Sequence, residues 1–108
     1  MNKPYKAAVI GCGNIAGRHD EEKTMEDAIF THAGAYREIS GVQLVAASDL
    51  DKKRLAQFGQ FWEVGKLYPD YQEMLKAETL DIISVCTPDD SHYQIIEDIL
   101  SIKPPALI

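Results

Sequence analysis

Short apolar runs alternate with polar segments of helical periodicity along most of the chain. Runs at Tyr5 to Ile10, Val42 to Ser48 and Leu80 to Cys86 are apolar enough to form strands that are buried on both faces. A brief strand is expected at Lys66 to Tyr68, and the apolar run Ala106-Leu107-Ile108 ends the chain inside a fifth strand. Strands that alternate with helices are typical of a parallel sheet. The pattern therefore predicts an α/β fold with a doubly wound parallel sheet that is truncated at the fifth strand.

The helical segments start at residues that commonly cap helices. Asp51 is expected to cap a short helix that ends at Gly59, and Asp70 with Glu73 has the spacing of a capping box. A last helix is indicated by apolar residues at helical spacing, namely Ile95, Ile96, Ile99 and Leu100. Right-handed crossovers give the strand order 3-2-1-4-5, in which ligands bind at the carboxyl ends of strands one and four.

A glycine loop follows the first strand. The segment Gly11-Cys12-Gly13-Asn14-Ile15-Ala16 has the spacing Gly-x-Gly-x-x-Ala between a strand and a helix. Glycines at these positions permit a tight turn and let backbone N–H groups approach a pyrophosphate at the helix N-terminus. The same glycines could instead serve only to pack the helix closely against the strand. The position of the loop favours the dinucleotide site of a Rossmann fold.

Asp49 closes the second long apolar run. From that position a carboxylate can accept hydrogen bonds from the adenosine ribose hydroxyls, although Asp49 could instead cap the helix that follows. A 2′-phosphate would meet this carboxylate with like charge, so the residue favours NAD over NADP. Lys52, Lys53 and Arg54 would weaken this preference if they turned inward to bind phosphate.

The glycine loop and Asp49 lie farther apart than a minimal fingerprint requires. They are separated by 38 residues, against the roughly 20 that are usual. The surplus falls in the acidic segment Asp20 to Thr31, after which Thr31-His32-Ala33 restarts a helix. We interpret the segment as a mobile cover at the mouth of the site. A surface insertion with a solvated acidic face is the alternative.

The composition is that of one soluble domain and narrows the possible partners. The chain has 108 residues, 45% of them hydrophobic, and its 17 acidic and 11 basic residues give a formal net charge of -6. This charge repels nucleic acid and anionic lipid, and no apolar run approaches the roughly 20 residues of a membrane helix. We therefore expect neither as a partner. The start Met1-Asn2-Lys3-Pro4 has no apolar signal region, which predicts a cytoplasmic location.

The two cysteines, Cys12 and Cys86, are too few for a disulfide scaffold and lack the close pairs of a structural zinc site. They flank adjacent strands, so they are expected to approach each other as two free thiols. Cys12, among backbone N–H groups at a helix start, is expected to favour the thiolate and to be protected by bound NAD. Cys86 is expected to be a buried small hydrophobic residue.

Three motifs in this order resemble the glucose-fructose oxidoreductase and inositol dehydrogenase family, Gfo/Idh/MocA. They are Gly11-Cys12-Gly13-Asn14-Ile15-Ala16, Ser48-Asp49-Leu50-Asp51 and Thr87-Pro88-Asp89-Asp90-Ser91-His92. All 108 residues fit the N-terminal half of that family. The resemblance implies a Rossmann domain whose cofactor-binding residues are Gly11, Cys12, Gly13, Asn14, Ile15, Asp49, Leu50, Thr87, Pro88 and His92.

The resemblance also implies what this chain lacks. In the family a following α+β domain holds a sugar, polyol or related substrate and mediates homo-oligomerisation, and a Glu-Lys-Pro motif after the fifth strand supplies a catalytic Lys. That motif would lie beyond Ile108. We therefore expect residues 1–108 to form a dinucleotide-binding domain that holds no catalytic residue and no metal ligand. The complete protein is expected to be an NAD-dependent oxidoreductase that moves hydride between the nicotinamide and a sugar-like substrate.

The Thr-Pro turn departs from the family pattern at Asp89, where the family has Asn. An ionised Asp only accepts hydrogen bonds, so a contact that uses the amide donor is in doubt. Asp89, Asp90 and Ser91 could simply cap the following helix. His92 could line the nicotinamide side or be purely structural.

Two other classes of function share part of this pattern. A signalling receiver needs a carboxylate pair after the first strand to hold magnesium, and Gly11-Cys12-Gly13 stands there instead. A non-catalytic, dinucleotide-sensing regulatory module would carry the same fingerprint, so it stays an alternative to the oxidoreductase.

Overall fold

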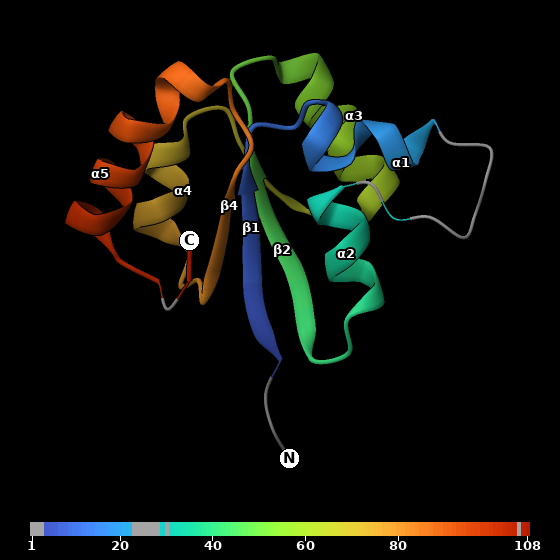
Figure 1. Cartoon of the computed structure of the whole chain (residues 1–108), viewed down its shortest axis with the longest axis horizontal. Helices are drawn as coiled ribbons and strands as arrows, with labels where there is room; N and C mark the ends of the chain where they lie inside the picture. The colour runs from blue at the N-terminus through green and yellow to red at the C-terminus, as the bar shows by residue number, and fades with distance from the viewer. Residues whose placement is uncertain (1–3, 23–28, 30, 106) are drawn as a thin grey trace.

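The computed structural model describes residues 4–22, 29, 31–105 and 107–108. Its centre is a sheet of four parallel strands in the order β3-β2-β1-β4. The strands are β1 (Tyr5–Ile10), β2 (Val42–Ser48), β3 (Lys66–Tyr68) and β4 (Ile82–Val85). Helices cover both faces of the sheet (Figure 1). The doubly wound α/β prediction is therefore confirmed.

The helices form one layer on each face. They are the π-helical η1 (Asn14–Arg18), α1 (His19–Glu21), α2 (His32–Glu38), α3 (Lys52–Trp62), α4 (Tyr71–Ala77), the 3-10 turn η2 (Asp89–Ser91) and α5 (His92–Ile102). In Figure 1, α2 and α3 lie on one side of the sheet and α4 and α5 on the other. Within the described ranges, no helix has the length and apolar character needed to cross a membrane.

Alternating side chains of the central strand β1 supply both halves of the core. Val9 points to the α2 and α3 side, where it belongs to one buried cluster with Phe58. Ile10 points to the other side and belongs to a second cluster with Met74 and Ile99. A strand that is buried on both faces in this way reads as a continuous apolar run, which is why the sequence pattern located β1.

The predicted strands agree with the sheet, with two differences in length. The strand expected over residues 80–86 is confined to β4, although Asp81 and Cys86 extend its backbone hydrogen bonds to β1 at both ends. The fifth strand is represented by Leu107, which forms an isolated parallel bridge with Ile82. Ala106, which the sequence also assigned to that strand, lies outside the described residues. The position of Leu107 beyond β4 agrees with the predicted order 3-2-1-4-5.

The expected end of α3 at Gly59 is wrong. The helix continues to Trp62 and ends at Glu63, whose left-handed backbone has φ 59°. Gly59 is instead a packing position, since a Cβ there would lie 2.6 Å from Leu67 Cδ1. The start of α3 is as predicted, because the Asp51 carboxylate accepts from the first backbone N–H groups of the helix.

The ends of the acidic segment are joined to each other. Asp20 Oδ2 accepts a hydrogen bond from Thr31 N at 3.0 Å and another from the Thr31 hydroxyl. Thr31 also caps α2 by accepting from Gly34 N at 3.1 Å. Residues 23–28 and 30 lie outside the described residues. The interpretation of this segment as a mobile cover therefore stays a prediction.

Candidate functional site

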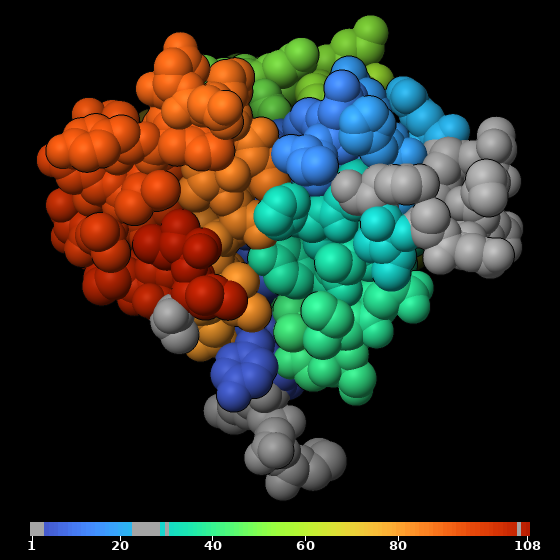
Figure 2. Space-filling view, in the orientation of Figure 1, coloured from blue at the N-terminus to red at the C-terminus, as the bar shows by residue number. Residues whose placement is uncertain are grey.

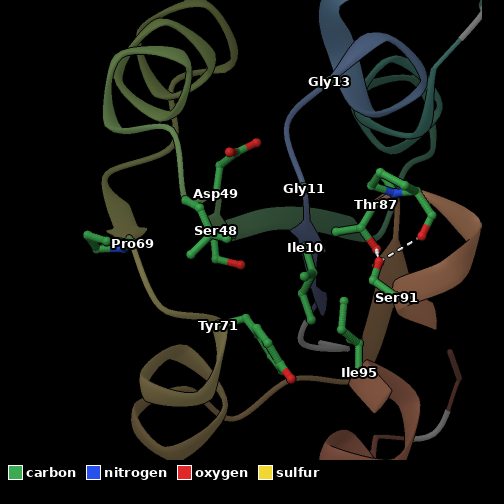
Figure 3. Close-up of a pocket in the computed structure, with 13 residues that line it drawn as sticks. Ile10, Gly11, Gly13, Ser48, Asp49, Pro69, Tyr71, Thr87, Ser91 and Ile95 are labelled. Atoms are coloured by element: carbon green, nitrogen blue, oxygen red, sulfur yellow. Dashed lines mark hydrogen bonds between the residues drawn. The ribbon is translucent and has the colours of Figure 1, made fainter. Parts of the chain in front are cut away.

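A cavity of about 400 Å³ opens at the carboxyl ends of β1, β2 and β4. Figure 3 shows Gly11 and Gly13 on one wall, Ser48 and Asp49 on a second, and Thr87 with Ser91 on a third. The lining residues are Ile10, Gly11, Gly13, Ser48, Asp49, Leu50, Pro69, Tyr71, Cys86, Thr87, Pro88, Ser91 and Ile95. The cavity therefore lies where parallel α/β sheets bind ligands.

The two loop glycines play different roles in this cavity. Gly11 has φ +89°, and a Cβ there would lie 2.9 Å from Thr87 Cγ2 and 3.1 Å from the Cys86 carbonyl carbon. Glycine is required there by both the backbone and the close approach of β4. Gly13 lines the cavity, and a Cβ at this position would meet nothing within 4 Å. The space above Gly13 is therefore open for a ligand to approach the backbone.

The Asp49 carboxylate is held in place by two backbone donors. Its Oδ2 accepts from Cys12 N at 2.7 Å, and its Oδ1 accepts from Asp51 N at 2.8 Å. A carboxylate oxygen has two lone pairs, so each oxygen retains capacity for a hydroxyl donor from a ligand. The alternative of Asp49 as the helix cap is wrong, because Asp51 caps α3.

Arg54 turns inward, as the sequence allowed, but it binds protein groups. Its Nε donates to the Cys12 carbonyl oxygen, and its two terminal nitrogens donate to Glu21 at 2.9 and 2.5 Å. Trp62 Nε1 donates to the same carboxylate at 2.9 Å. The hydrogen bond with Glu21 raises the pKa of Arg54, which stays a cation. Lys52, on the outer face of α3, is exposed.

The Thr-Pro turn forms the wall nearest β4. The Ser91 hydroxyl lies 2.7 Å from both Thr87 Oγ1 and the Pro88 carbonyl oxygen (Figure 3). Neither η2 nor α5 has a side-chain hydrogen bond at its N-cap. Capping by a side-chain hydrogen bond is therefore not seen at either helix start, because the Ser91 hydroxyl closes the turn instead. The acidic start that the capping alternative expected is present, since Asp89 and Asp90 lie in the first turn of η2.

His92 turns away from the cavity that holds the glycines. Its Nε2 lies 2.6 Å from the Thr87 carbonyl oxygen, and its ring lines a second cavity of about 390 Å³. In that cavity His32 Nδ1 lies 2.9 Å from Ser84 Oγ, which also bonds the Tyr36 hydroxyl. Figure 2 shows β4 at the surface between α5 and α2, where this second cavity lies.

The structure brings together six of the ten predicted cofactor-binding residues. Gly11, Gly13, Asp49, Leu50, Thr87 and Pro88 line the cavity. Cys12 does not line the cavity, since its side chain is fully buried and its backbone N–H donates to Asp49. Ile15 lines a separate depression with Thr31 and His32, and Asn14 is exposed beside it.

The expectation that Cys12 favours the thiolate and that Cys86 is the buried cysteine is wrong. Cys12 is fully buried, and its thiol donates to the Ser48 carbonyl oxygen at 3.5 Å. Burial raises the pKa of the Cys12 thiol, and the neighbouring Asp49 carboxylate raises it further, so the thiolate is disfavoured. Cys86 lines the cavity and is partly exposed, and burial raises its pKa to about 11. Both thiols are free, as expected.

Sequence reasoning missed the cavity wall that follows β3. Pro69 and Tyr71 line the cavity (Figure 3). The Tyr71 hydroxyl donates to Asp98 on α5. The signal was available, because a parallel strand that ends at Tyr68 places the next residues at the same edge as Gly11.

Comparison with known proteins identifies the architecture. Residues 5–108 match the model of the Gfo/Idh/MocA family, described as an oxidoreductase family with an NAD-binding Rossmann fold. The chain belongs to this family. The predicted resemblance and Rossmann fold are thereby confirmed, with NAD as the cofactor of the fold. The open space above Gly13 and the free lone pairs of Asp49 fit such a dinucleotide.

Several known proteins are similar to this chain. The D-apiose dehydrogenase of Paraburkholderia graminis is 35% identical over 95 residues, which are 88% of this chain and 22% of that protein. The crystal structure of myo-inositol 2-dehydrogenase from Lactobacillus plantarum has a TM-score of 0.71 at 30% identity, over 93% of this chain and 26% of that one. An oxidoreductase from Agrobacterium radiobacter, solved with NAD+ and L-tartaric acid, is 24% identical with a TM-score of 0.73, over 94% of this chain and 26% of that one. The chain therefore spans about a quarter of the length of these relatives.

Proposed function

We propose that this chain is the dinucleotide-binding domain of an NAD-dependent oxidoreductase that transfers hydride between the nicotinamide and a carbinol carbon of a sugar, polyol or related substrate. The observation that carries the proposal is the cavity in which the open backbone of Gly13 faces the Asp49 carboxylate. When bound, the nicotinamide supplies the hydride chemistry, and the residues of this chain bind and orient the dinucleotide.

Each wall of the cavity has a role in this proposal. The glycine loop receives the pyrophosphate at Gly13, and Asp49 accepts from the adenosine ribose hydroxyls. Leu50, which is 90% exposed, and Pro69 offer apolar surface beside Asp49 for the adenine ring. Thr87 and Pro88, across the cavity, lie on the side of the nicotinamide. The remaining sequence-predicted residues, Cys12, Asn14, Ile15 and His92, support the loop or border the site.

The proposal includes a preference for NAD over NADP. Among the described residues that line the cavity, Asp49 is charged and none is cationic, so a 2′-phosphate would meet a negative wall. A charge-assisted hydrogen bond from the ribose is worth about 1.5 to 3 kcal/mol. Titration calorimetry is expected to show tighter binding of NAD than of NADP, and Asp49→Ala is expected to weaken NAD binding by about tenfold or more.

Asp81 provides the matched control for this experiment. Its carboxylate also accepts a backbone N–H, from Lys6 at 2.8 Å, but β4 follows it, so it lies at the opposite end of the sheet. Asp81→Ala is expected to leave the NAD affinity unchanged. Equal affinities of the wild type for NAD and NADP, or undiminished NAD binding by Asp49→Ala, would contradict the assignment of Asp49.

The substrate class is supported by the names of similar family members, which include D-apiose and D-glucoside dehydrogenases. In the proposal, the substrate domain and the contacts of a homo-oligomer lie outside residues 1–108. The proposed location is the cytoplasm, with which the two free thiols agree. The test is reduction of NAD by the complete protein presented with aldoses and polyols. Binding of NAD without turnover of any member of such a panel would favour the regulatory module.

A further inference from the structure

Glu21 and Arg54 form a buried ion pair beside the cofactor cavity. Their side chains are 11% and 6% exposed, and the pairing is bidentate, with two terminal nitrogens of the guanidinium on two carboxylate oxygens. Neither residue lines the cavity that Asp49 and Gly13 share, and both line a depression on the outer side of the loop. The pair therefore lies outside the proposed cofactor cavity.

A single residue of the glycine loop connects this pair to the proposed ribose-binding carboxylate. The N–H of Cys12 donates to Asp49 at 2.7 Å, and the carbonyl of Cys12 accepts from Arg54 Nε. Asp51 joins the two from the other side, because its N–H donates to Asp49 and its carboxylate accepts from Arg54 N at 3.1 Å. Arg54 is thus a buried cation that Cys12 and Asp51 connect to the proposed ribose-binding carboxylate of Asp49.

An arginine near the ribose is the group that dinucleotide sites use to hold a 2′-phosphate. Here Glu21 occupies the end of the guanidinium that such a phosphate would need. The Glu21 carboxylate is itself fixed, since Trp62 Nε1 donates to it at 2.9 Å and a Cβ on Gly17 would lie 2.9 Å from its Oε2. Arg54 therefore has its charge neutralised by a carboxylate that is held by α3 and η1.

We propose that Glu21 is a specificity-determining residue, which selects NAD over NADP by holding the Arg54 guanidinium away from the 2′ position of the ribose. Glu21 touches no part of the proposed cofactor site and acts through Arg54. This inference rests on the proposed function, because it assumes that the dinucleotide binds with its ribose at Asp49. It adds that Asp49 alone does not determine the cofactor preference.

The test compares the dissociation constants of NAD and NADP for the wild type and Glu21→Gln by titration calorimetry. Glutamine keeps the shape of the side chain and an acceptor for Trp62, but it leaves the cation of Arg54 without its charge partner. The ratio of the NADP to the NAD dissociation constant is expected to fall by about tenfold, which corresponds to about 1.4 kcal/mol. A general loss of stability lowers both affinities together and leaves this ratio unchanged.

Glu22→Gln is the matched control. Glu22 is adjacent in sequence and lines the same outer depression, and among the described contacts it has no hydrogen bond to Arg54. The substitution Glu22→Gln removes the same charge but leaves the Arg54 ion pair intact, so the ratio of the NADP to the NAD dissociation constant is expected to equal that of the wild type. In the double variant Glu21→Gln with Arg54→Met, the gain in NADP affinity is expected to disappear.

An unchanged ratio in folded Glu21→Gln would overturn the inference, as would a gain that persists in the double variant or appears equally in Glu22→Gln. If Glu21→Gln does not fold, Trp62→Phe takes its place, because it removes one hydrogen-bond donor from Glu21. The ratio of the NADP to the NAD dissociation constant is then expected to fall by a smaller factor. An unchanged ratio in Trp62→Phe would overturn the inference as well. A wild type that binds neither dinucleotide would instead overturn the proposed function, so the two failures are distinguishable.

Discussion

Gly17→Ala is expected to destabilise the fold, although alanine is the better helix former. Gly17 lies in η1, directly after the glycine loop, and it faces α3. A Cβ at this position would lie 2.5 Å from Trp62 Nε1, 2.8 Å from Phe58 Cε2 and 2.9 Å from Glu21 Oε2. Phe58 is fully buried and Trp62 nearly so, and neither ring has room to retreat. The substitution therefore separates η1 from α3.

The size of the effect follows from three contributions. Overpacking a filled core costs about 1 to 3 kcal/mol. Loss of the hydrogen bond from Trp62 to the charged Glu21 costs about 1.5 to 3 kcal/mol. The higher helix propensity of alanine returns about 0.5 to 1 kcal/mol. The free energy of unfolding is therefore expected to fall by about 2 to 5 kcal/mol, and each kcal/mol lowers the melting temperature by about 4 to 8 °C in a domain of this size.

Urea unfolding followed by circular dichroism measures this change, and Gly13→Ala is the control. Gly13 belongs to the same loop, but a Cβ there meets nothing within 4 Å and its φ is −79°. Its variant is expected to unfold within about 0.5 kcal/mol of the wild type while binding NAD more weakly, since the methyl group enters the ligand space. A Gly17→Ala protein as stable as the Gly13→Ala protein would refute the packing argument.

Two further predictions concern titratable groups. Alkylation is expected to modify Cys86 before Cys12, because Cys86 lines the cavity with a pKa of about 11 while Cys12 is buried. Bound NAD is expected to slow the labelling of Cys86. Peptide mass mapping measures the order of labelling, and faster labelling of Cys12 would contradict the prediction. The Tyr71 hydroxyl lowers the pKa of the Asp98 carboxyl, so this contact adds stability above the unfolded pKa of Asp98 and loses it as the pH falls through the folded value. Tyr71→Phe is expected to raise the pKa of Asp98 in an NMR titration, and an unchanged value would show that the contact does not form.

The strands and the cavity edge were predictable because they depend on local pattern and topology. Continuous apolar runs mark strands that are buried on both faces, as in β1 and β2. Parallel order then places Gly11, Asp49 and Thr87 at one edge, and the cavity contains all three. The end of α3 was not predictable in this way. The backbone freedom of glycine makes Gly59 a common helix end, but here the absence of a side chain at Gly59 leaves space for Leu67 to pack against the helix.

Side-chain direction was not predictable from spacing. The sequence places Cys12 between two glycines that face a ligand, but the turn at Gly11 directs the thiol into the core on the other side of the loop. Arg54 follows two lysines, and a run of three basic residues is typical of a helix face in contact with water. The burial of Arg54 depends on Glu21, a residue 33 positions away. This pair joins α1 to α3, which are far apart in the sequence, and no local pattern encodes such a contact.

Trp62 has a further consequence for experiments on this chain, because it is the single tryptophan in the sequence. Its indole is 8% exposed, donates to Glu21, and lies 4.4 Å from the Arg37 guanidinium. Indole emission depends on nearby charge and on contact with water, and this indole is linked to the glycine loop through one ion pair. Fluorescence excited at this residue is therefore expected to change when a dinucleotide binds at the loop, and stopped-flow mixing can follow that binding without an attached dye.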